Sequence, residues 1–476
     1  MVFSSNIFLF AFLPLFLLAY YCTPKRGRSL TIVIGSWLFY AWWRVDFLLL
    51  YAAVTVWTYW IGGRIEQAAS RQLAISARRW MQLGVAGVLM VLGYFKYYNF
   101  FGPEIADILG VAHADHWLFV KIVLPIGVSF FVFEAISYLV DVYRKDAPPA
   151  RNLIDFAAFL ALYPHLIAGP VMKYKDLANQ IVDRTHSFSK FSEGSVLFMI
   201  GFCKKVLIAD TVAPLADQAF RLSAPTWVEA WLGTLAYTVQ LYFDFSGYSL
   251  MAIGLGLMIG FRLIKNFDAP YLSLSITEFW RRWHISLSTW LREYLYISLG
   301  GNRKGRIRTY VNLWLTMVLG GLWHGANWTF IIWGMWHGTI LVLERLLGGR
   351  GQRTPYPRLL AWPITILLVM IGWVMFRAHT VHEAVDFYRG MLGFNGFAIR
   401  PEFAWRITGL EQAMLFIGLC IVPCEGFIRK RHYRGRVPAL PVSRASFAAV
   451  GLSLLTGLAV LKLSADAYSP FLYFQF

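Results

Sequence analysis

The sequence predicts an all-α protein that crosses a membrane many times. Of its 476 residues, 58% are hydrophobic, and 20 are tryptophan and 38 phenylalanine. Only 15% are charged, whereas a soluble globular protein carries roughly 25% charged residues. The mean hydropathy is +0.53. These observations favour a polytopic membrane protein that forms one integral domain over residues 1–476.

Apolar segments follow one another along most of the chain. A helix needs about 20 mostly apolar residues to cross the hydrocarbon core of a bilayer, with tolerance on either side. We predict spans near 6–22, 30–43, 47–63, 81–97, 118–140, 225–243, 249–261, 309–323, 327–346, 359–377, 408–427 and 446–463. The first segment lacks a basic region before it and a small-residue cleavage site after it, so we expect a retained span. We divide the domain into N-terminal spans (1–150), a catalytic core (151–346) and C-terminal spans (347–476).

The positive charge of the chain lies in short clusters between these segments. The net charge of +18 would suit nucleic acid, but clusters of this kind are typical of cytoplasmic loops that face anionic lipid. Alternation of the clusters predicts that 64–79 and 428–444 face the cytoplasm, whereas 98–117 and both termini face the periplasm. We therefore expect a multi-pass protein of the bacterial inner membrane that contacts lipids and binds no nucleic acid.

Three stretches interrupt the pattern of simple spans. Residues 161–175 contain Pro164, Gly169 and Pro170, which a helix cannot pass undisturbed, and irregular backbone survives at membrane depth only inside protein or beside water. We expect this stretch to line a cavity. Residues 181–196 are polar and are expected outside lipid. Charged and aromatic residues alternate over 274–298, which predicts an amphipathic helix in an interface or a cavity.

Histidines in the apolar part of the chain are the candidates for chemistry. His324 lies among glycines in LGGLWHGANW, and a polar side chain at membrane depth by default marks a pathway or a site. Its alternative is a histidine that locks two helices together. His284, in WRRWHIS, can orient a partner, bind an anion or face headgroups, and neighbouring cations would favour its neutral form. For His337 packing is the favoured interpretation, and His165 is ambiguous.

Asp244 lies in an apolar run, QLYFDFSGYS, where it can bond a buried histidine or a lysine such as Lys204 or Lys205. Ser246 is not a hydrolase nucleophile, which would need a G-x-S-x-G turn. The sequence contains no P-loop, dinucleotide fingerprint or zinc spacing. Two classes stay open, an enzyme that uses His324 and a transporter. A transporter more often has a pair of broken helices in two similar halves, so the enzyme is favoured.

Three long motifs resemble the membrane-bound O-acyltransferase family, and within it the bacterial alginate O-acetyltransferase branch. They are FDFSGYS, the run NFDAPYLSLSITEFWRRWHISLSTWLREYLYISLGGNRKG, and GGLWHGANWTFIIWGMWHG. Stretches nearer the N-terminus, such as LPIGVSFFVFEAISYLVDVYR and PHLIAGPV, resemble that branch too, whereas 390–476 matches weakly. One departure is Leu250, which stands where many relatives have aspartate.

The resemblance implies a ring of about 11–13 transmembrane helices around a central funnel, with re-entrant and interfacial helices. His324 matches the catalytic histidine and His284 the second histidine of the family pattern. We expect the substrate-binding residues to be Trp323, Asn327, Asp244 and Arg281.

The resemblance also implies a reaction and its participants. Acetyl groups would pass from a cytoplasmic donor, acetyl-CoA or another acyl thioester, to hydroxyls of an exported polysaccharide, with periplasmic partner proteins. Alginate, with its mannuronate residues, is the favoured acceptor, and peptidoglycan or cellulose are alternatives. No metal and no tightly bound cofactor are expected. Gly320, Gly321 and Gly325 are expected to give the reactants room.

Overall fold

The computed structural model describes residues 1–108, 110, 121–167, 169–348, 356–357, 359–433 and 442–465. Regular structure in these residues is entirely helical, which confirms the predicted class. The chain forms two compact units. One is built from 1–198 with 252–264, and the other from 199–251 with 265–476. The division at 150 and 346 stays a prediction.

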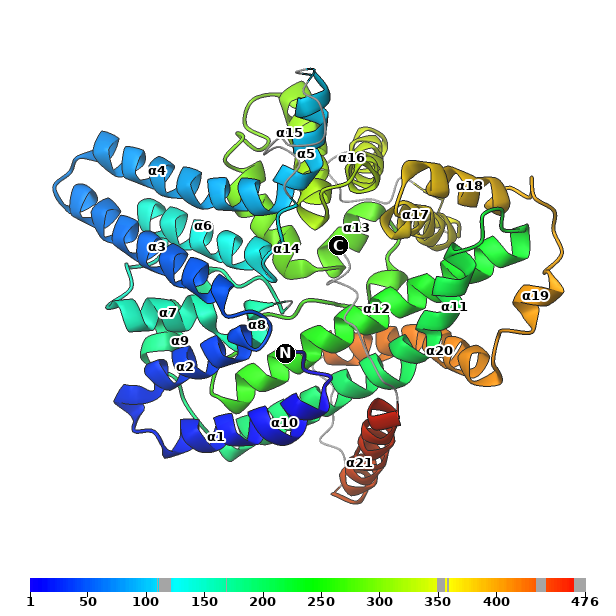
Figure 1. The fold of residues 1–476 in the computed structure, drawn as a ribbon, viewed down its shortest axis with the longest axis horizontal. Helices are drawn as coiled ribbons and strands as arrows, with labels where there is room; N and C mark the ends of the chain where they lie inside the picture. The colour runs from blue at the N-terminus through cyan, green and yellow to red at the C-terminus, as the bar shows by residue number, and fades with distance from the viewer. Residues whose placement is uncertain are drawn as a thin grey trace. The chain divides into compact units, whose positions relative to one another are not determined.

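The first unit contains the N-terminal helices (Figure 1). They are η1 (Phe8–Phe12), α1 (Leu13–Cys22), η2 (Lys25–Gly27), α2 (Arg28–Ala41), α3 (Asp46–Ser70), α4 (Ala74–Leu92), η3 (Gly93–Tyr97), α5 (Tyr98–Ile108), α6 (Val128–Arg144), α7 (Leu153–Ala161), α8 (Tyr163–Leu166), α9 (Tyr174–Val182) and most of α10 (Phe188–Cys203). Helices α3, α4 and α6 pack against one another. They meet at Gly84, where an added Cβ would lie 2.7 Å from Ile61 and 2.8 Å from Leu139.

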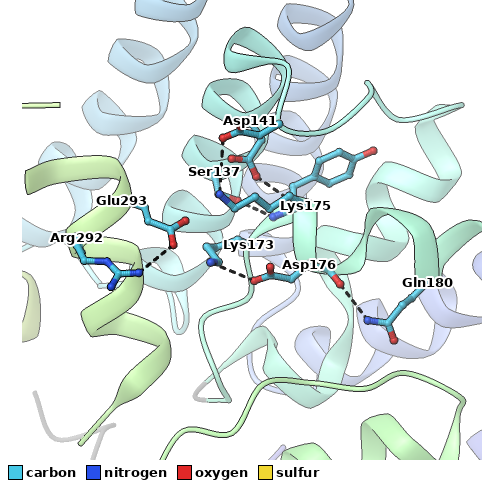
Figure 2. Close-up of polar contacts among 10 residues, drawn as sticks. Ser137, Asp141, Lys173, Lys175, Asp176, Gln180, Arg292 and Glu293 are labelled. Carbon is cyan, nitrogen blue, oxygen red and sulfur yellow. Dashed lines mark hydrogen bonds and ion pairs between the residues drawn. The ribbon is translucent and has the colours of Figure 1, made fainter. Parts of the chain in front are cut away.

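The helix breaks in 161–175, as its prolines and glycine predicted. The described residues between α8 and α9 are not helical, and α9 begins only at Tyr174. Two side chains of α6 accept hydrogen bonds from backbone N–H groups at this start (Figure 2). Ser137 Oγ accepts a hydrogen bond from Tyr174 N at 3.0 Å, and Asp141 Oδ2 accepts one from Lys175 N at 3.1 Å. A neighbouring helix therefore supplies the capping groups that the segment itself lacks.

His165 lies in this break and is fully buried. Its Nδ1 bonds Glu134 Oε1 of α6, which is also fully buried. His165 therefore does not face acyl chains. Had it faced them, a cavity-lining role for 161–175 would have been refuted. That role itself stays a prediction. The contact instead makes His165 a tie between the broken segment and α6.

The second unit contains both His284 and His324, and Figure 1 labels its α-helices. Its helices are η5 (Lys204–Ala209), α11 (Asp210–Phe220), most of α12 (Trp227–Met258), η6 (Pro270–Leu272), α13 (Ile276–Arg282), α14 (Ile285–Trp290), η7 (Leu291–Tyr296), α15 (Arg306–His324), α16 (Trp328–Gly348), α17 (Ala361–Arg377), α18 (Val381–Met391), α19 (Pro401–Ala404), α20 (Gly409–Tyr433) and α21 (Val442–Ala465). Segments η5 and η7 are π-helices.

The two predicted spans 225–243 and 249–261 are wrong, because the single helix α12 covers Trp227–Met258. The motif FSGYS does not interrupt it. Gly247 faces α10 instead, where an added Cβ would lie 2.7 Å from Gly201 O. A single glycine costs a helix only about 1 kcal/mol, and here it allows two backbones to approach closely.

The predicted continuous amphipathic helix over 274–298 is also wrong. The stretch consists of α13, α14 and the π-helix η7, with a break between α13 and α14 at Trp283 and His284. Trp283 is extended, and His284 has left-handed backbone angles of φ 45° and ψ 55°. The break follows from long-range contacts of the backbone at His284, which alternation of residue types cannot reveal.

Four helices of the described chain are long and apolar enough to cross a membrane: Trp227–Met258, Trp328–Gly348, Gly409–Phe427 and Phe447–Ala465. Phe8–Cys22 and Ala361–Arg377 are shorter apolar helices. The ring, the funnel and the full number of spans stay predictions. Parts of the predicted loops 98–117 and 428–444, and the C-terminus from 466, lie outside the described residues.

Candidate active site

His324 is the last residue of α15, where the helix turns back into α16. Gly325, which follows, is extended, and Asn327 Oδ1 accepts a hydrogen bond from Thr329 N at 3.1 Å at the start of α16. The two helices approach closely at Gly334, because an added Cβ there would lie 2.6 Å from Met317 O. The tight pairing of α15 and α16 fixes the backbone that carries His324.

The glycines around His324 pack closely against neighbouring residues of the protein and leave no space for reactants. A Cβ on Gly321 would overlap the carbonyl oxygen of Phe330, and one on Gly325 would overlap the Phe330 ring. At Gly320 the nearest atom is Leu291 Cδ1 at 3.2 Å. The expectation that these glycines leave space for substrate is therefore wrong, since packed side chains and backbone already fill that space.

Aromatic rings surround the imidazole of His324, which is 7% exposed. The ring centroids of Trp323, Trp333 and Phe376 lie 5.0, 5.2 and 5.3 Å from the centroid of His324. The Trp333 ring stands perpendicular to the imidazole, at 90°. These apolar walls restrict water and strengthen any hydrogen bond that forms beside the histidine.

His284 occupies a tight turn next to this aromatic group. Its imidazole centroid lies 6.5 Å from that of His324, 6.4 Å from Trp323 and 4.7 Å from Phe245. The left-handed conformation costs a residue with a side chain about 1–2 kcal/mol. Strain of this kind persists where surrounding contacts enforce it and is concentrated at functional sites. The structure therefore brings together the two histidines that the sequence singled out.

The hydrogen bonds of His284 define which nitrogen carries its proton. The backbone N–H of Leu287 donates to His284 Nδ1 at 3.2 Å. Because an N–H group can only donate, Nδ1 must be the unprotonated nitrogen and Nε2 carries hydrogen in the neutral ring. Among the described residues Nε2 has no hydrogen-bond partner. His284 thus offers a buried N–H donor.

Burial lowers the pKa of His284 to about 3, so the ring stays neutral at physiological pH. The helices on either side of it, α13 and α14, are too short to cross a membrane. The expectation that the ring is neutral agrees with this shift. The main cause of the lowered pKa is desolvation of the buried ring. From the sequence we expected neighbouring cations to be the cause.

His337 on α16 belongs to the same aromatic group. Its ring centroid lies 5.0 Å from Trp333 and 5.3 Å from Trp280. The side chain is fully buried, and neither ring nitrogen has a hydrogen-bond partner in the part of the chain that is described. These contacts agree with a packing role, as expected for this residue.

The predicted substrate-binding residues occupy different surroundings. Trp323 lies against both histidines. Asn327 caps α16 and also donates from Nδ2 to His379 O at 2.8 Å. Asp244 pairs with Lys205 at 2.8 Å, one of the two lysines anticipated for it, and Arg281 is exposed on α13. Substrate binding by all four stays a prediction.

Sequence reasoning missed several residues of this site. Trp333 and Phe376 form walls around His324, and Phe245 contacts His284. Phe245 follows Asp244 in the motif QLYFDFSGYS, so the sequence had already drawn attention to the segment that contains it. Phe376 lies on α17, far along the chain, and no local pattern connects it with His324.

A model of the membrane-bound O-acyltransferase family matches residues 20–379. The chain is 53% identical to the probable alginate O-acetylase AlgI of Pseudomonas putida, over the whole of both chains. It is 36% identical to the peptidoglycan O-acetyltransferase of Helicobacter pylori, over 84% of this chain and 81% of that one. It is 25% identical to the teichoic acid D-alanyltransferase of Bacillus subtilis, over 62% and 84%.

The match to the family covers α12 to α17, and with them both histidines and the rings around them. The similarity to the Pseudomonas putida protein continues through the C-terminal region, where the resemblance to the family was weak. On the evidence of the family match and these full-length relatives, the chain belongs to the membrane-bound O-acyltransferase family and is an acyltransferase.

Proposed function

We propose that this acyltransferase moves acetyl groups onto hydroxyls of alginate. The observation that carries the chemistry is the pair of buried histidines whose ring centroids lie 6.5 Å apart within aromatic walls. The acceptor is supported by the full-length identity of 53% to a protein named as a probable alginate O-acetylase. Peptidoglycan is the second candidate, because a relative with 36% identity carries that name.

His324 acts as the general base in this proposal. An acceptor hydroxyl oxygen attacks the carbonyl carbon of the acetyl thioester while His324 takes the hydroxyl proton. The tetrahedral intermediate then collapses, the carbon–sulfur bond breaks, and His324 returns the proton to the departing thiolate. A positioned general base contributes typically about 10²–10⁴-fold in rate.

His284 supplies a hydrogen-bond donor for the charge that develops on the carbonyl oxygen. Its Nε2–H is buried and has no partner among the described residues. Removal of one oxyanion donor costs about 10²–10³-fold in an enzyme that depends on it. The two histidines thus have different duties in the proposed transfer.

The donor and the partners follow from the expected orientation in the membrane. Basic cytoplasmic loops would attract an anionic thioester donor such as acetyl-CoA, and the glycan lies on the other side. Direct transfer to the glycan and relay through a serine of a periplasmic partner both agree with this chemistry. We propose that the protein is a multi-pass protein of the bacterial inner membrane with both termini in the periplasm.

The catalytic assignment is tested with His324→Gln and His324→Ala in cells that secrete the polymer. We expect normal abundance in the membrane and a loss of polymer O-acetyl of at least about 100-fold. His382→Gln is the control, because that histidine is exposed and contacts Asp386 on the same helix. Near-normal acetylation by either His324 variant would show that His324 is structural.

The orientation is tested by cysteine labelling from outside on a cysteine-free background. His382 and Arg71 are both exposed, and the alternation of basic clusters places them on opposite sides. We expect His382→Cys to react with an impermeant maleimide and Arg71→Cys to react only after the membrane is opened. The reverse pattern would overturn the orientation.

A further inference from the structure

Asn266 holds the turn that carries His284. Its backbone carbonyl accepts a hydrogen bond from Ile285 N at 2.9 Å. Its side-chain Oδ1 accepts two more, from Ser286 N at 3.2 Å and from Ser286 Oγ at 2.9 Å. One residue, 1% exposed, therefore binds both backbone N–H groups that directly follow His284.

The segment around Asn266 runs beside the turn at several further points. Asp268 N donates to the carbonyl of Arg282 at 3.0 Å. The Phe267 ring lies 5.1 Å from Trp283 and 5.0 Å from Phe245. The residues on both sides of His284 are thus fixed against the same short segment, which enforces a backbone conformation that histidine rarely adopts.

The contacts also establish the orientation of the Asn266 amide. Ser286 N can only donate, so the atom that faces it must be the oxygen. The amide nitrogen Nδ2 therefore points away from Ser286. It is buried and has no partner among the described residues, and a buried amide group without a partner is costly. Fold stability alone does not account for an asparagine that leaves its NH₂ group unused.

We infer that Asn266 is a positioning residue for the reaction, because it holds His284 in the left-handed turn from which its imidazole presents a free N–H beside His324. The inference rests on the proposed donor role of His284. Asn266 fixes the backbone conformation of the turn at His284. The Leu287 N–H fixes the orientation of the imidazole by donating to its Nδ1. Without Asn266, the turn relaxes toward ordinary angles and the Nε2–H leaves its place.

Asn312 is a matched control for the loss of a buried asparagine. It is also 1% exposed, lies in the same unit, and ties a turn by donating from Nδ2 to Gly301 O at 3.0 Å and to Leu299 O at 3.3 Å. Its turn carries no histidine. Asn312→Ala should lower stability as Asn266→Ala does, while activity per folded molecule stays normal.

The test is a double-mutant cycle in the full-length protein, with polymer O-acetyl normalised to membrane abundance. We expect Asn266→Ala to lose about 10–100-fold, which is less than the loss of about 10²–10³-fold on complete removal of an oxyanion donor. Asn266→Asp keeps the acceptor for Ser286 and should lose less. The double variant Asn266→Ala with His284→Ala should lose no more than His284→Ala alone, since the residue acts through His284. Additive losses, or normal activity of Asn266→Ala, would overturn the inference.

A second measurement separates this inference from the proposed function. The ¹⁵N signals of the His284 imidazole, assigned by comparison with His284→Ala, report its tautomer and surroundings whatever the activity. We expect Asn266→Ala to shift or broaden them and Asn312→Ala to leave them unchanged. If the signals move although His284→Ala is fully active, the catalytic role of His284 fails while positioning holds. Unchanged signals in Asn266→Ala would refute positioning outright.

Discussion

Buried histidines occur in both units of the molecule, and their surroundings differ. In the first unit His165 lies directly against Glu134, and neither side chain is exposed. In the second unit His324 is enclosed by Trp323, Trp333 and Phe376, and the Nε2–H of His284 has no partner in the described part of the chain. All three lie in apolar helical surroundings, so burial alone does not distinguish them.

The difference lies in what occupies the imidazole. A histidine bonded to a buried carboxylate has a fixed partner, and each member of the pair depends on the other. His284, whose Nε2–H has no partner among the described residues, keeps a donor for a group that arrives with a substrate. The first arrangement holds a broken helix in place, and the second suits proton transfer and charge stabilisation.

After loss of the proposed base His324, the largest expected effect is at His284. His284→Phe keeps an aromatic ring beside Phe245 but loses the donor, and we expect about 10²–10³-fold less O-acetyl per molecule. His284→Asn should lose less, because asparagine tolerates left-handed angles and retains an N–H donor. Polymer O-acetyl normalised to protein abundance measures both. Equal losses of O-acetyl in the two variants would show that the reaction does not depend on a hydrogen-bond donor at this position.

The His165 pair should respond in abundance rather than in activity. Glu134→Ala leaves His165 without its partner, and loss of one member of a buried pair costs about 3–5 kcal/mol. We expect a lower unfolding temperature in detergent, while O-acetyl per remaining molecule stays normal. The double variant Glu134→Leu with His165→Phe should regain stability. A specific loss of activity at full abundance would instead place this pair in the reaction.

The glycines near His324 give an intermediate effect that tests the boundary of the site. Gly321→Ala would press a methyl group against the Phe330 carbonyl, and overpacking of this kind costs typically about 1–3 kcal/mol. Gly320→Ala meets only Leu291 Cδ1 at 3.2 Å and should cost less. Thermal unfolding of both variants compares them. If Gly321→Ala were stable but bound substrate weakly, the space at Gly321 would belong to a reactant.

The smallest effect is expected at the start of α9. Ser137→Ala removes the acceptor for Tyr174 N (Figure 2), and loss of such a capping bond costs about 1 kcal/mol. We expect a slightly lower unfolding temperature and unchanged O-acetyl per molecule. Val140→Ala on the same helix provides a comparison for a small change in packing. An effect of Ser137→Ala on activity larger than on stability would contradict a purely structural cap.

Much of this protein was predictable from its residues in order. Composition and hydropathy predict the helical class, because the requirement to satisfy backbone hydrogen bonds in lipid acts on every segment locally. Pro164, Gly169 and Pro170 predict the break in 161–175 for the same local reason. The two histidines of the site were also found, since polar groups in apolar surroundings are rare and their motifs are long.

Tertiary structure alone decided what each polar group does. Gly247 of α12 packs against the carbonyl of Gly201, which lies on another helix. His165 receives its carboxylate from α6, and His324 receives Phe376 from α17. The tautomer of His284 and its support by Asn266 depend on contacts across a turn. Residues far apart in the chain make these contacts, and their packing against one another has no signature in local composition or periodicity.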